Sequence, residues 1–333
     1  MSAGSSAPSS PTSPIGRGAG GAGAGDRLGV RWGLAGGTAL ASIDEVCEVA
    51  RYAVAAGFDS LWISHANAVD PIVALASTAA ETTGLVEVGT SVVPLYGRHP
   101  IGLAQLARTA QSALHGRFTL GIGAASRNAV RTSMGLAWNR PLAYTRDFIA
   151  GLQPLLAGEV ADVDGESVTT HAELNIAAAG TPILLAALGP KMLELAGRRV
   201  QGTTLGQCGP RTIASYVAPA LHAAAEAEGR PAPRIMALIR ICVTDDPGPA
   251  YALARETAAR YRTVPSYEAV QDMEGLAEPA DLHLIGSWER ILDGLGAYAE
   301  AGVTDFRLEV AAPDHAARDA TREALAEHLR GGG

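Results

Sequence analysis

The sequence has few of the residues on which disulfide-rich and zinc-binding proteins depend. Its 333 residues include only three cysteines, Cys47, Cys208 and Cys242, which are far apart and form no CxxC pair. An odd number of isolated cysteines favours buried thiols in a reducing compartment over a disulfide framework. We therefore expect a cytoplasmic protein.

Positive charge and long apolar runs are also scarce. Lysine and arginine total 26 against 34 aspartate and glutamate residues, which gives a net charge of −8 and a pI near 5.5. A nucleic-acid partner would need a basic face, and a membrane span would need roughly 18 unbroken apolar residues. The composition therefore favours a protein that acts on a small molecule or a peptide, with no nucleic-acid or membrane partner.

The first 26 residues have almost no bulky apolar side chains. They are mostly glycine, alanine, serine and proline, and such a segment buries too little surface to offset the entropy of ordering it. It also lacks the apolar core of a secretory signal. We expect residues 1–26 to be a disordered tail and residues 27–333 to form one folded domain.

From residue 28 onward, short apolar runs alternate with helical patterns. The runs predict strands over residues 28–34, 60–64, 86–92, 118–122, 182–186, 201–205, 235–243 and 304–310. About eight strand–helix units predict a parallel sheet that closes into a (β/α)₈ TIM barrel. An open doubly wound sheet is the alternative, but Gly33, Gly36 and Gly37 lack the GxGxxG spacing that this fold normally has after its first strand.

Capping residues predict where the first two helices begin and end. Ser42 precedes a helical pattern, and Glu45 stands three residues later, as in a capping box. Gly57 follows the pattern and supplies a left-handed stop. Asp70 and the proline after it begin a second helix, which we expect to run to about Thr83.

The active site of a barrel lies at the carboxyl ends of its strands. Residues 123–143 and 263–283 are longer than ordinary loops, and we expect them to form lids or substrate walls. The strand ends contain no HxH or HExxH motif, no pair of carboxylates and no Ser/His/Asp set that spacing identifies. We therefore expect no metal, and a bound cofactor that carries the reaction.

The end of the fifth strand suits an anion. An apolar run continues into the stretch LGPKM, residues 188–192. Proline fits the first position of a helix, glycine allows close approach to the backbone, and free amides at a helix start attract negative charge. A plain strand-to-helix turn with a solvated lysine explains the same residues, so spacing alone leaves both readings open.

Four segments carry a resemblance to a known family. They read SHANAVDPIVALASTAAETT from Ser64, VEVGTSVVPLYGRHPIGLAQ from Val86, GRFTLGIGAAS from Gly116 and AALGPKMLELAG from Ala186. Together they resemble the luciferase-like monooxygenase superfamily, above all the branch that depends on the deazaflavin coenzyme F420. That branch includes methylenetetrahydromethanopterin reductase and the F420 type of glucose-6-phosphate dehydrogenase. The resemblance implies a (β/α)₈ TIM barrel of the bacterial luciferase-like type with insertion segments, a homodimer, and F420 lying across the strand ends.

The resemblance also implies which residues hold the coenzyme. A non-proline cis peptide would join Ser91 to Val92 and form a bulge behind the deazaflavin ring. The backbone of the LGPKM stretch would hold the coenzyme's phosphate, whereas Arg127 is either a solvated loop charge or a clamp for its anionic tail. The implied cofactor-binding set is Ser64, His65, Ser91, Val92, Val93, Pro94, Ala124, Ser126, Arg127, Leu188, Gly189, Lys191 and Met192.

The chain departs from the family pattern at several positions. His65 stands where an acid followed by a histidine is usual, so it is either a proton donor beside the ring or a bystander. Ser126 replaces a general-base glutamate of the sugar-phosphate dehydrogenase, and Gly209 replaces its phosphate-binding lysine. The usual Ala-Asp-Gly after the fifth helix reads VQG at residues 200–202. These changes disfavour sugar phosphate oxidation and leave His65 and Ser126 as candidate catalytic residues.

The function that follows is reduction by F420H₂. We expect hydride transfer from reduced deazaflavin to a C=C or C=N bond of an organic substrate, for which an unsaturated amino acid or peptide intermediate of secondary metabolism is one candidate. An FMNH₂-dependent monooxygenase on the same barrel is the first alternative, although FMN fits the resemblance less well. A non-catalytic binding protein with a degenerate site is the second.

Overall fold

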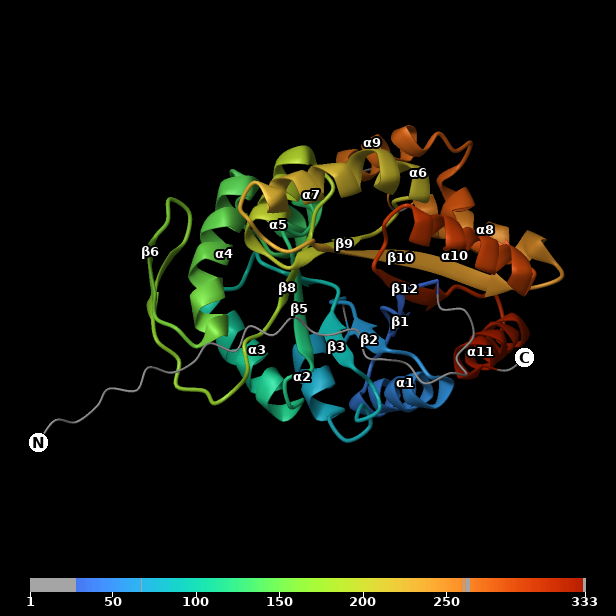
Figure 1. Cartoon of the computed structure of the whole chain (residues 1–333), viewed down its shortest axis with the longest axis horizontal. Coiled ribbons are helices and arrows are strands. Elements are labelled where there is room, and N and C mark those ends of the chain that lie inside the picture. The colour runs from blue at the N-terminus through green and yellow to red at the C-terminus, as the bar shows by residue number, and fades with distance from the viewer. Residues whose placement is uncertain (1–27, 67, 260, 262–263, 332–333) are drawn as a thin grey trace, which may run out of the picture.

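The computed structural model describes residues 28–331 except 67, 260 and 262–263. The predicted tail over residues 1–26 therefore lies outside the described residues. Strands occupy the centre of the described chain, and helices surround them (Figure 1). Among the described helices, none combines the length and the apolar character needed to cross a membrane.

Eight parallel strands form a closed barrel. Each strand pairs with the next, and the last pairs with the first. The predicted (β/α)₈ barrel is therefore confirmed, and the open doubly wound alternative is wrong. The barrel strands are β1 (Arg31–Ala35), β2 (Ser60–Ile63), β3 (Glu87–Thr90), β5 (Phe118–Gly123), β8 (Ile183–Ala186), β9 (Gly202–Leu205), β10 (Arg234–Val243) and β12 (Asp305–Val310).

Helices follow the strands as expected and lie outside the barrel. Most begin at a proline, which has no free amide to satisfy, or directly after a side chain that accepts from a free amide of the first turn. The outer helices are α1 (Ile43–Ala56), α2 (Pro71–Ser77), α3 (Pro100–Ala113), α4 (Pro141–Ala157), α5 (Pro190–Arg199), α7 (Ala218–Glu226), α8 (Pro247–Ala259), α10 (Trp288–Glu300) and α11 (His315–Arg330).

Two details of the predicted helix ends need correction. Ser42 accepts a hydrogen bond from the Glu45 amide as expected, but the Glu45 carboxylate accepts from Ala41 instead of Ser42. Helix α2 ends at Ser77, well before the predicted Thr83. The hydroxyl of Thr78 donates to the carbonyl of Leu75, and such side-chain bonds compete with helical backbone bonding.

Elements outside the eight strand–helix units are mostly short. The hairpin of β6 (Ala161–Asp164) and β7 (Thr169–Ala172) was not predicted, because its residues show no long apolar run. Strand β3 ends before the predicted strand 86–92 does, and a separate strand, β4 (Val93–Pro94), follows that range and pairs with β5. The remaining short elements are β11 (Leu284–Gly286), α6 (Pro210–Thr212), the π-helical turns η1 (Ala129–Ser133) and η2 (Ile213–Val217), and the 3₁₀ turn η3 (Pro279–Leu282).

The second insertion segment is more helical than predicted. Residues 263–283 were expected to be a long loop, but most of them form α9 (Pro265–Glu274) and η3. Proline at the start and Gly275 in the left-handed conformation at the end delimit this helix. The first insertion, 123–143, begins at the last residue of β5, contains η1 and ends in the first turn of α4.

A cluster of buried charges fills the amino end of the barrel. Arg234 on β10 donates two hydrogen bonds of 2.8 Å to Glu87 on β3, and it donates a third of 2.8 Å to Asp305 on β12. Arg31 on β1 forms ion pairs with the same two carboxylates. Burial raises the pKa of Asp305, but the two arginines lower it by more, so its pKa lies below the usual range.

An apolar layer lies directly above this cluster. Trp62, Leu184 and Met236 are fully buried against one another inside the barrel. Gly89 makes room for the indole, because a Cβ there would lie 2.3 Å from a ring carbon of Trp62. The guanidinium of Arg234 lies 5.9 Å from the centre of the same ring. These described side chains fill the barrel to its middle, and the cavity lined by Ser64, Ser91 and Arg307 lies toward the carboxyl ends.

We predict that Arg234→Ala destabilises the fold by roughly 3–5 kcal/mol, because it leaves two buried carboxylates without their main partner. Arg198→Ala is the control, since Arg198 pairs with Glu194 and Glu228 on the surface and should cost less than about 1 kcal/mol. Urea unfolding at neutral pH measures both. The loss of unfolding free energy caused by Arg234→Ala should shrink below about pH 4. There Asp305 begins to gain a proton in the unfolded chain, and the stability it contributes is lost progressively as the pH falls to its pKa in the folded protein. Equal costs for both variants would contradict this account.

Candidate active site

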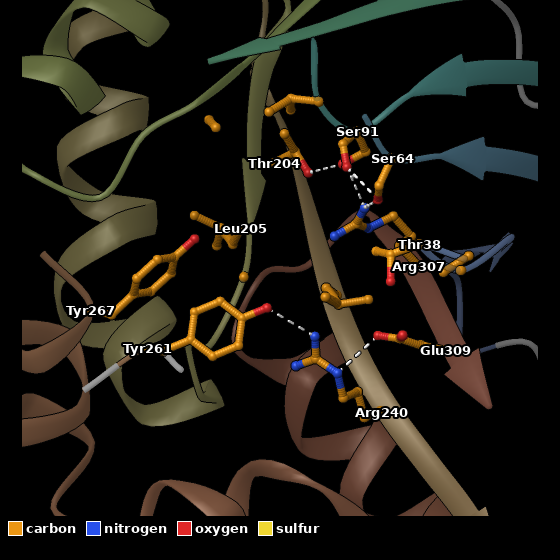
Figure 2. Close-up of a pocket in the computed structure, with 16 residues that line it drawn as sticks. Thr38, Ser64, Ser91, Thr204, Leu205, Arg240, Tyr261, Tyr267, Arg307 and Glu309 are labelled. Atoms are coloured by element: carbon orange, nitrogen blue, oxygen red, sulfur yellow. Dashed lines mark hydrogen bonds and ion pairs between the residues drawn. The ribbon is translucent and has the colours of Figure 1, made fainter. Parts of the chain in front are cut away.

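A cavity of about 220 Å³ lies above the apolar layer, at the carboxyl ends of the strands. Strands β9, β10 and β12 form its walls together with the ends of β1, β2 and β3, and Tyr267 of α9 lines it from one side (Figure 2). The second insertion segment thus contributes to the wall of this cavity, as expected. The polar side chains around it are Thr38, Ser64, Ser91, Thr204, Arg240, Tyr261, Tyr267, Arg307 and Glu309.

Three of the predicted coenzyme-binding residues line this cavity. The peptide bond between Ser91 and Val92 is cis, which confirms the prediction for that bond. The Ser64 hydroxyl donates to the Ser91 carbonyl at 2.8 Å, and the hydroxyls of Ser91 and Thr204 are 2.9 Å apart. These bonds join the ends of β2, β3 and β9 into one rigid wall.

The neighbouring predicted residues lie along β4 and the end of β5. Val93 is fully buried in the core, whereas Pro94 and Ala124 are partly exposed. Pro94 is paired with Gly123 across the two strands, so it lies near the residue that precedes Ala124. None of these three residues lines the cavity beside Arg307.

His65 is held at the end of β2 by its backbone. Its amide donates to the Val92 carbonyl at 3.4 Å, while its side chain is exposed and does not line the cavity. Partial burial lowers the pKa of the imidazole, the nearby Arg98 guanidinium lowers it further, and Asp70 opposes them. The ring is therefore mostly neutral at pH 7.

In the LGPKM turn the Met192 amide is already engaged, because it donates to the Gly189 carbonyl at 3.0 Å, so an anion would meet the amides of Gly189 and Lys191. Gly189 is the N-cap residue of α5, and no side chain caps that helix end. A Cβ built on Gly189 would have no atom within 4 Å, so the space beside the backbone is free. The Tyr216 hydroxyl donates to the Leu188 carbonyl at 3.0 Å and fixes the turn, Met192 packs against the core, and Lys191 is exposed. This arrangement fits a phosphate.

A second, larger hollow of about 950 Å³ lies where the two insertion segments meet. Residues 126–128, 131 and 132 line it from the first segment, and Val264 and Pro265 line it from the second. The Ser126 hydroxyl already accepts one hydrogen bond, from the Ala129 amide. Arg127 and Arg131 line the hollow, and neither forms an ion pair with a residue that the structure describes. The hollow is therefore open and positively charged.

Sequence reasoning missed the charged residues of the smaller cavity. Arg240 on β10 forms an ion pair with Glu309 on β12 at 2.8 Å and donates to the Tyr261 hydroxyl at 3.3 Å. Arg307 lies one inward position below Glu309 on the same strand. A signal was present, because a charged residue inside an apolar barrel strand points either to buried pairing or to a ligand.

Two of the departures from the family pattern have structural explanations. A Cβ on Gly209 would lie 2.2 Å from the Glu274 carboxyl carbon, and Glu274 accepts from the amides of Arg211 and Thr212. A carboxylate therefore lies beside the position of the dehydrogenase's lysine, which opposes phosphate binding there. Gln201 accepts from the Ile183 amide at 2.8 Å and ties β9 to β8. Within the described residues, no cluster of three or more histidine, cysteine or carboxylate side chains could hold a metal ion.

Comparison with known proteins agrees with this geometry. The family model described as luciferase-like monooxygenase matches residues 27–305. The chain is 29% identical over 272 residues to 5,10-methylenetetrahydromethanopterin reductase of Methanolobus tindarius, covering 80% of this chain and 82% of that protein. It is 30% identical over 226 residues to F420-dependent glucose-6-phosphate dehydrogenase of Mycolicibacterium fortuitum, covering 63% of this chain and 67% of that protein.

Its fold also matches that of a solved structure. The coenzyme F420-dependent tetrahydromethanopterin reductase of Methanopyrus kandleri superposes with a TM-score of 0.73 at 19% identity, over 90% of this chain and 98% of that chain. The barrel, the cis peptide at the end of β3 and the family match over most of the chain all agree with the resemblance seen in the sequence. The chain belongs to the luciferase-like monooxygenase family.

Proposed function

We propose that this protein is an oxidoreductase that uses coenzyme F420. The observation that carries the proposal is the uncapped turn at Gly189, which offers open backbone amides to a phosphate at the carboxyl end of the barrel. Similarity to an F420-dependent dehydrogenase over two thirds of that relative's length supports the choice of F420. An enzyme, rather than a degenerate binding protein, is supported by the cavity, by the turn at Gly189 and by the similarity to F420-dependent oxidoreductases.

Different residues of the chain bind different parts of the coenzyme. The backbone of Leu188, Gly189 and Lys191 holds the phosphate, whereas the amide of Met192, also expected there, donates to the Gly189 carbonyl. Arg127 and Arg131 attract the anionic tail into the larger hollow. The ring lies along the ends of β2 to β5, beside Ser64, His65, Ser91, Val92, Val93, Pro94, Ala124 and Ser126. When bound, reduced F420 supplies a hydride.

Reduction is the direction that the site favours. Ser126 stands where the sugar-phosphate dehydrogenase has a general base, and Glu274 lies beside the position of its phosphate-binding lysine. The substrate is a polarised C=C or C=N bond in a small molecule or peptide, for which an unsaturated amino acid or peptide of secondary metabolism is the candidate. His65 or Ser126 provides the proton that accompanies the hydride. The homodimer and the cytoplasmic location stay predictions.

The first test is the choice of coenzyme. We expect the purified protein to bind F420 with micromolar or better affinity and FMN at least about tenfold more weakly, a difference of about 1.4 kcal/mol in binding free energy. Fluorescence titration with each coenzyme measures this. Equal or preferred binding of FMN would favour the alternative, an FMNH₂-dependent monooxygenase, and binding of neither would favour a non-catalytic protein.

The second test addresses the phosphate turn. Gly189→Val should weaken F420 binding strongly, because its side chain occupies the space in front of the amides. The folded protein has room for that side chain, so its melting temperature should hardly change. Lys191→Ala should weaken binding by only about 1 kcal/mol, the usual size of one charge at a helix end. Loss of binding in the lysine variant alone would mean that the side chain, and not the backbone, is the anchor.

The third test concerns His65. If its imidazolium donates the proton, turnover falls as pH rises through its pKa, which lies below 6.5 because of burial and Arg98. His65→Ala should lower turnover at least about tenfold and leave F420 affinity unchanged. His65→Asn keeps a hydrogen bond but cannot donate the proton, and it should abolish that limb of the pH profile. Normal turnover in both variants would transfer the role to Ser126 or to a phenol of the cavity, Tyr261 or Tyr267.

A further inference from the structure

Arg307 is a buried cation without a carboxylate partner in hydrogen-bond contact. Only 6% of the residue is exposed, and it lines the floor of the smaller cavity. One of its nitrogens, Nη1, donates to the Ser91 carbonyl at 2.8 Å and to the Ser64 hydroxyl at 3.4 Å. Its Nε is buried and has no acceptor among the described residues, and no acceptor for Nη2 is found there either.

The charge of Arg307 persists in spite of this burial. Burial lowers its pKa to about 10, while the nearest carboxylate, Glu309, opposes that shift. A group with this pKa is protonated at neutral pH. The Ser91 carbonyl and the Ser64 hydroxyl, which accept its hydrogen bonds, are uncharged, so these bonds do not neutralise Arg307.

The second arginine of the cavity is different. Arg240 forms an ion pair with Glu309 at 2.8 Å and donates to the Tyr261 hydroxyl. Figure 2 shows this pair on one side of the cavity and Arg307 at its centre, beside Ser64 and Ser91. The two arginines and one glutamate leave the cavity with a net charge of about +1, and that charge belongs to Arg307.

The same chain neutralises a buried arginine fully where no ligand is involved. At the amino end of the barrel, Arg234 contacts both Glu87 and Asp305. Arg108 is also buried without a carboxylate partner, but it donates to the backbone carbonyls of Leu156, Ile176 and Ala178 and does not line the cavity. Arg307 has one carbonyl and one hydroxyl as acceptors and faces the cavity, so a counter-charge from outside the chain can reach it and offset the cost of its burial.

We propose that Arg307 binds a carboxylate of the substrate at the floor of this cavity. The proposal rests on the proposed function and narrows its substrate class to anionic, unsaturated acids. A planar guanidinium matches a planar carboxylate better than it matches other groups. The cavity of about 220 Å³ far exceeds the ~10–15 Å³ that one water needs, so a carboxylate and several carbon atoms fit. Ser91 and Val92 line the same cavity, which brings the bound acid next to the expected position of the ring.

The test uses two probes of nearly the same shape, crotonate and crotonamide, which differ in charge. Binding to the full-length protein is followed by ligand-observed NMR, first without coenzyme and then with F420. We expect crotonate to bind at least about tenfold more tightly than crotonamide, as expected for a charge-assisted hydrogen bond. Arg307→Gln should abolish this preference. Arg198→Gln, on the surface, should keep it.

Further measurements separate this role from others. Arg307→Lys keeps the charge and should retain part of the crotonate preference, which guards against a folding defect in the glutamine variant. F420 titration of Arg307→Gln should match that of the wild type. If F420 binds neither the wild type nor Arg307→Gln, the proposed coenzyme is wrong. The crotonate preference measured without coenzyme still tests whether Arg307 binds a carboxylate.

Three results would overturn the proposal. The first is that crotonate binds the wild type no more tightly than crotonamide does. Inorganic phosphate could bind at Arg307 in preference to crotonate, which would indicate a phosphate site. Arg307→Gln could lose F420 while keeping the crotonate preference, which would make the arginine a coenzyme contact.

Discussion

The interior of the barrel is filled from one end by side chains that alternate along the strands. Because every second residue of a strand points inward, β12 places Asp305, Arg307 and Glu309 at three successive depths. The lowest of them joins the ion cluster around Arg234, and the apolar layer around Trp62 lies above that cluster. This filling leaves the carboxyl end as the only hollow part of the barrel interior within the described residues.

Ion pairs form at both ends of the barrel, but Arg307 at the carboxyl end differs from the buried arginines at the amino end. At the amino end, arginines and carboxylates neutralise each other. Removing one of them would leave a buried charge without a partner, which destabilises the fold. At the carboxyl end, Arg307 is held by a carbonyl and a hydroxyl, and its charge stays available. We therefore expect stability and the proposed ligand binding to depend on different residues of the same strands, so that each can be altered separately.

Much of the fold followed from the sequence because its signals are local. The alternation of apolar runs and capped helices sets the eight units, and Ser42, Gly57 and Asp70 form the caps that their residue types favour. The early end of α2, the β6–β7 hairpin and helix α9 were missed, since competing side-chain bonds and short amphipathic segments leave weak patterns. The cis bond at Ser91 came from the family resemblance and not from periodicity.

The candidate site was only partly predictable for a physical reason. The Gly189 turn is contiguous in sequence, so it could be found there, whereas Arg240, Arg307 and Tyr267 meet only when distant elements close around the barrel.

The most direct test of the account is a crystal structure of the protein with F420. We expect the phosphate at the amides of Gly189 and Lys191 and the ring beside Ser91, with the cavity at Arg307 left free for substrate. A phosphate bound elsewhere, or a ring that fills the Arg307 cavity, would contradict it.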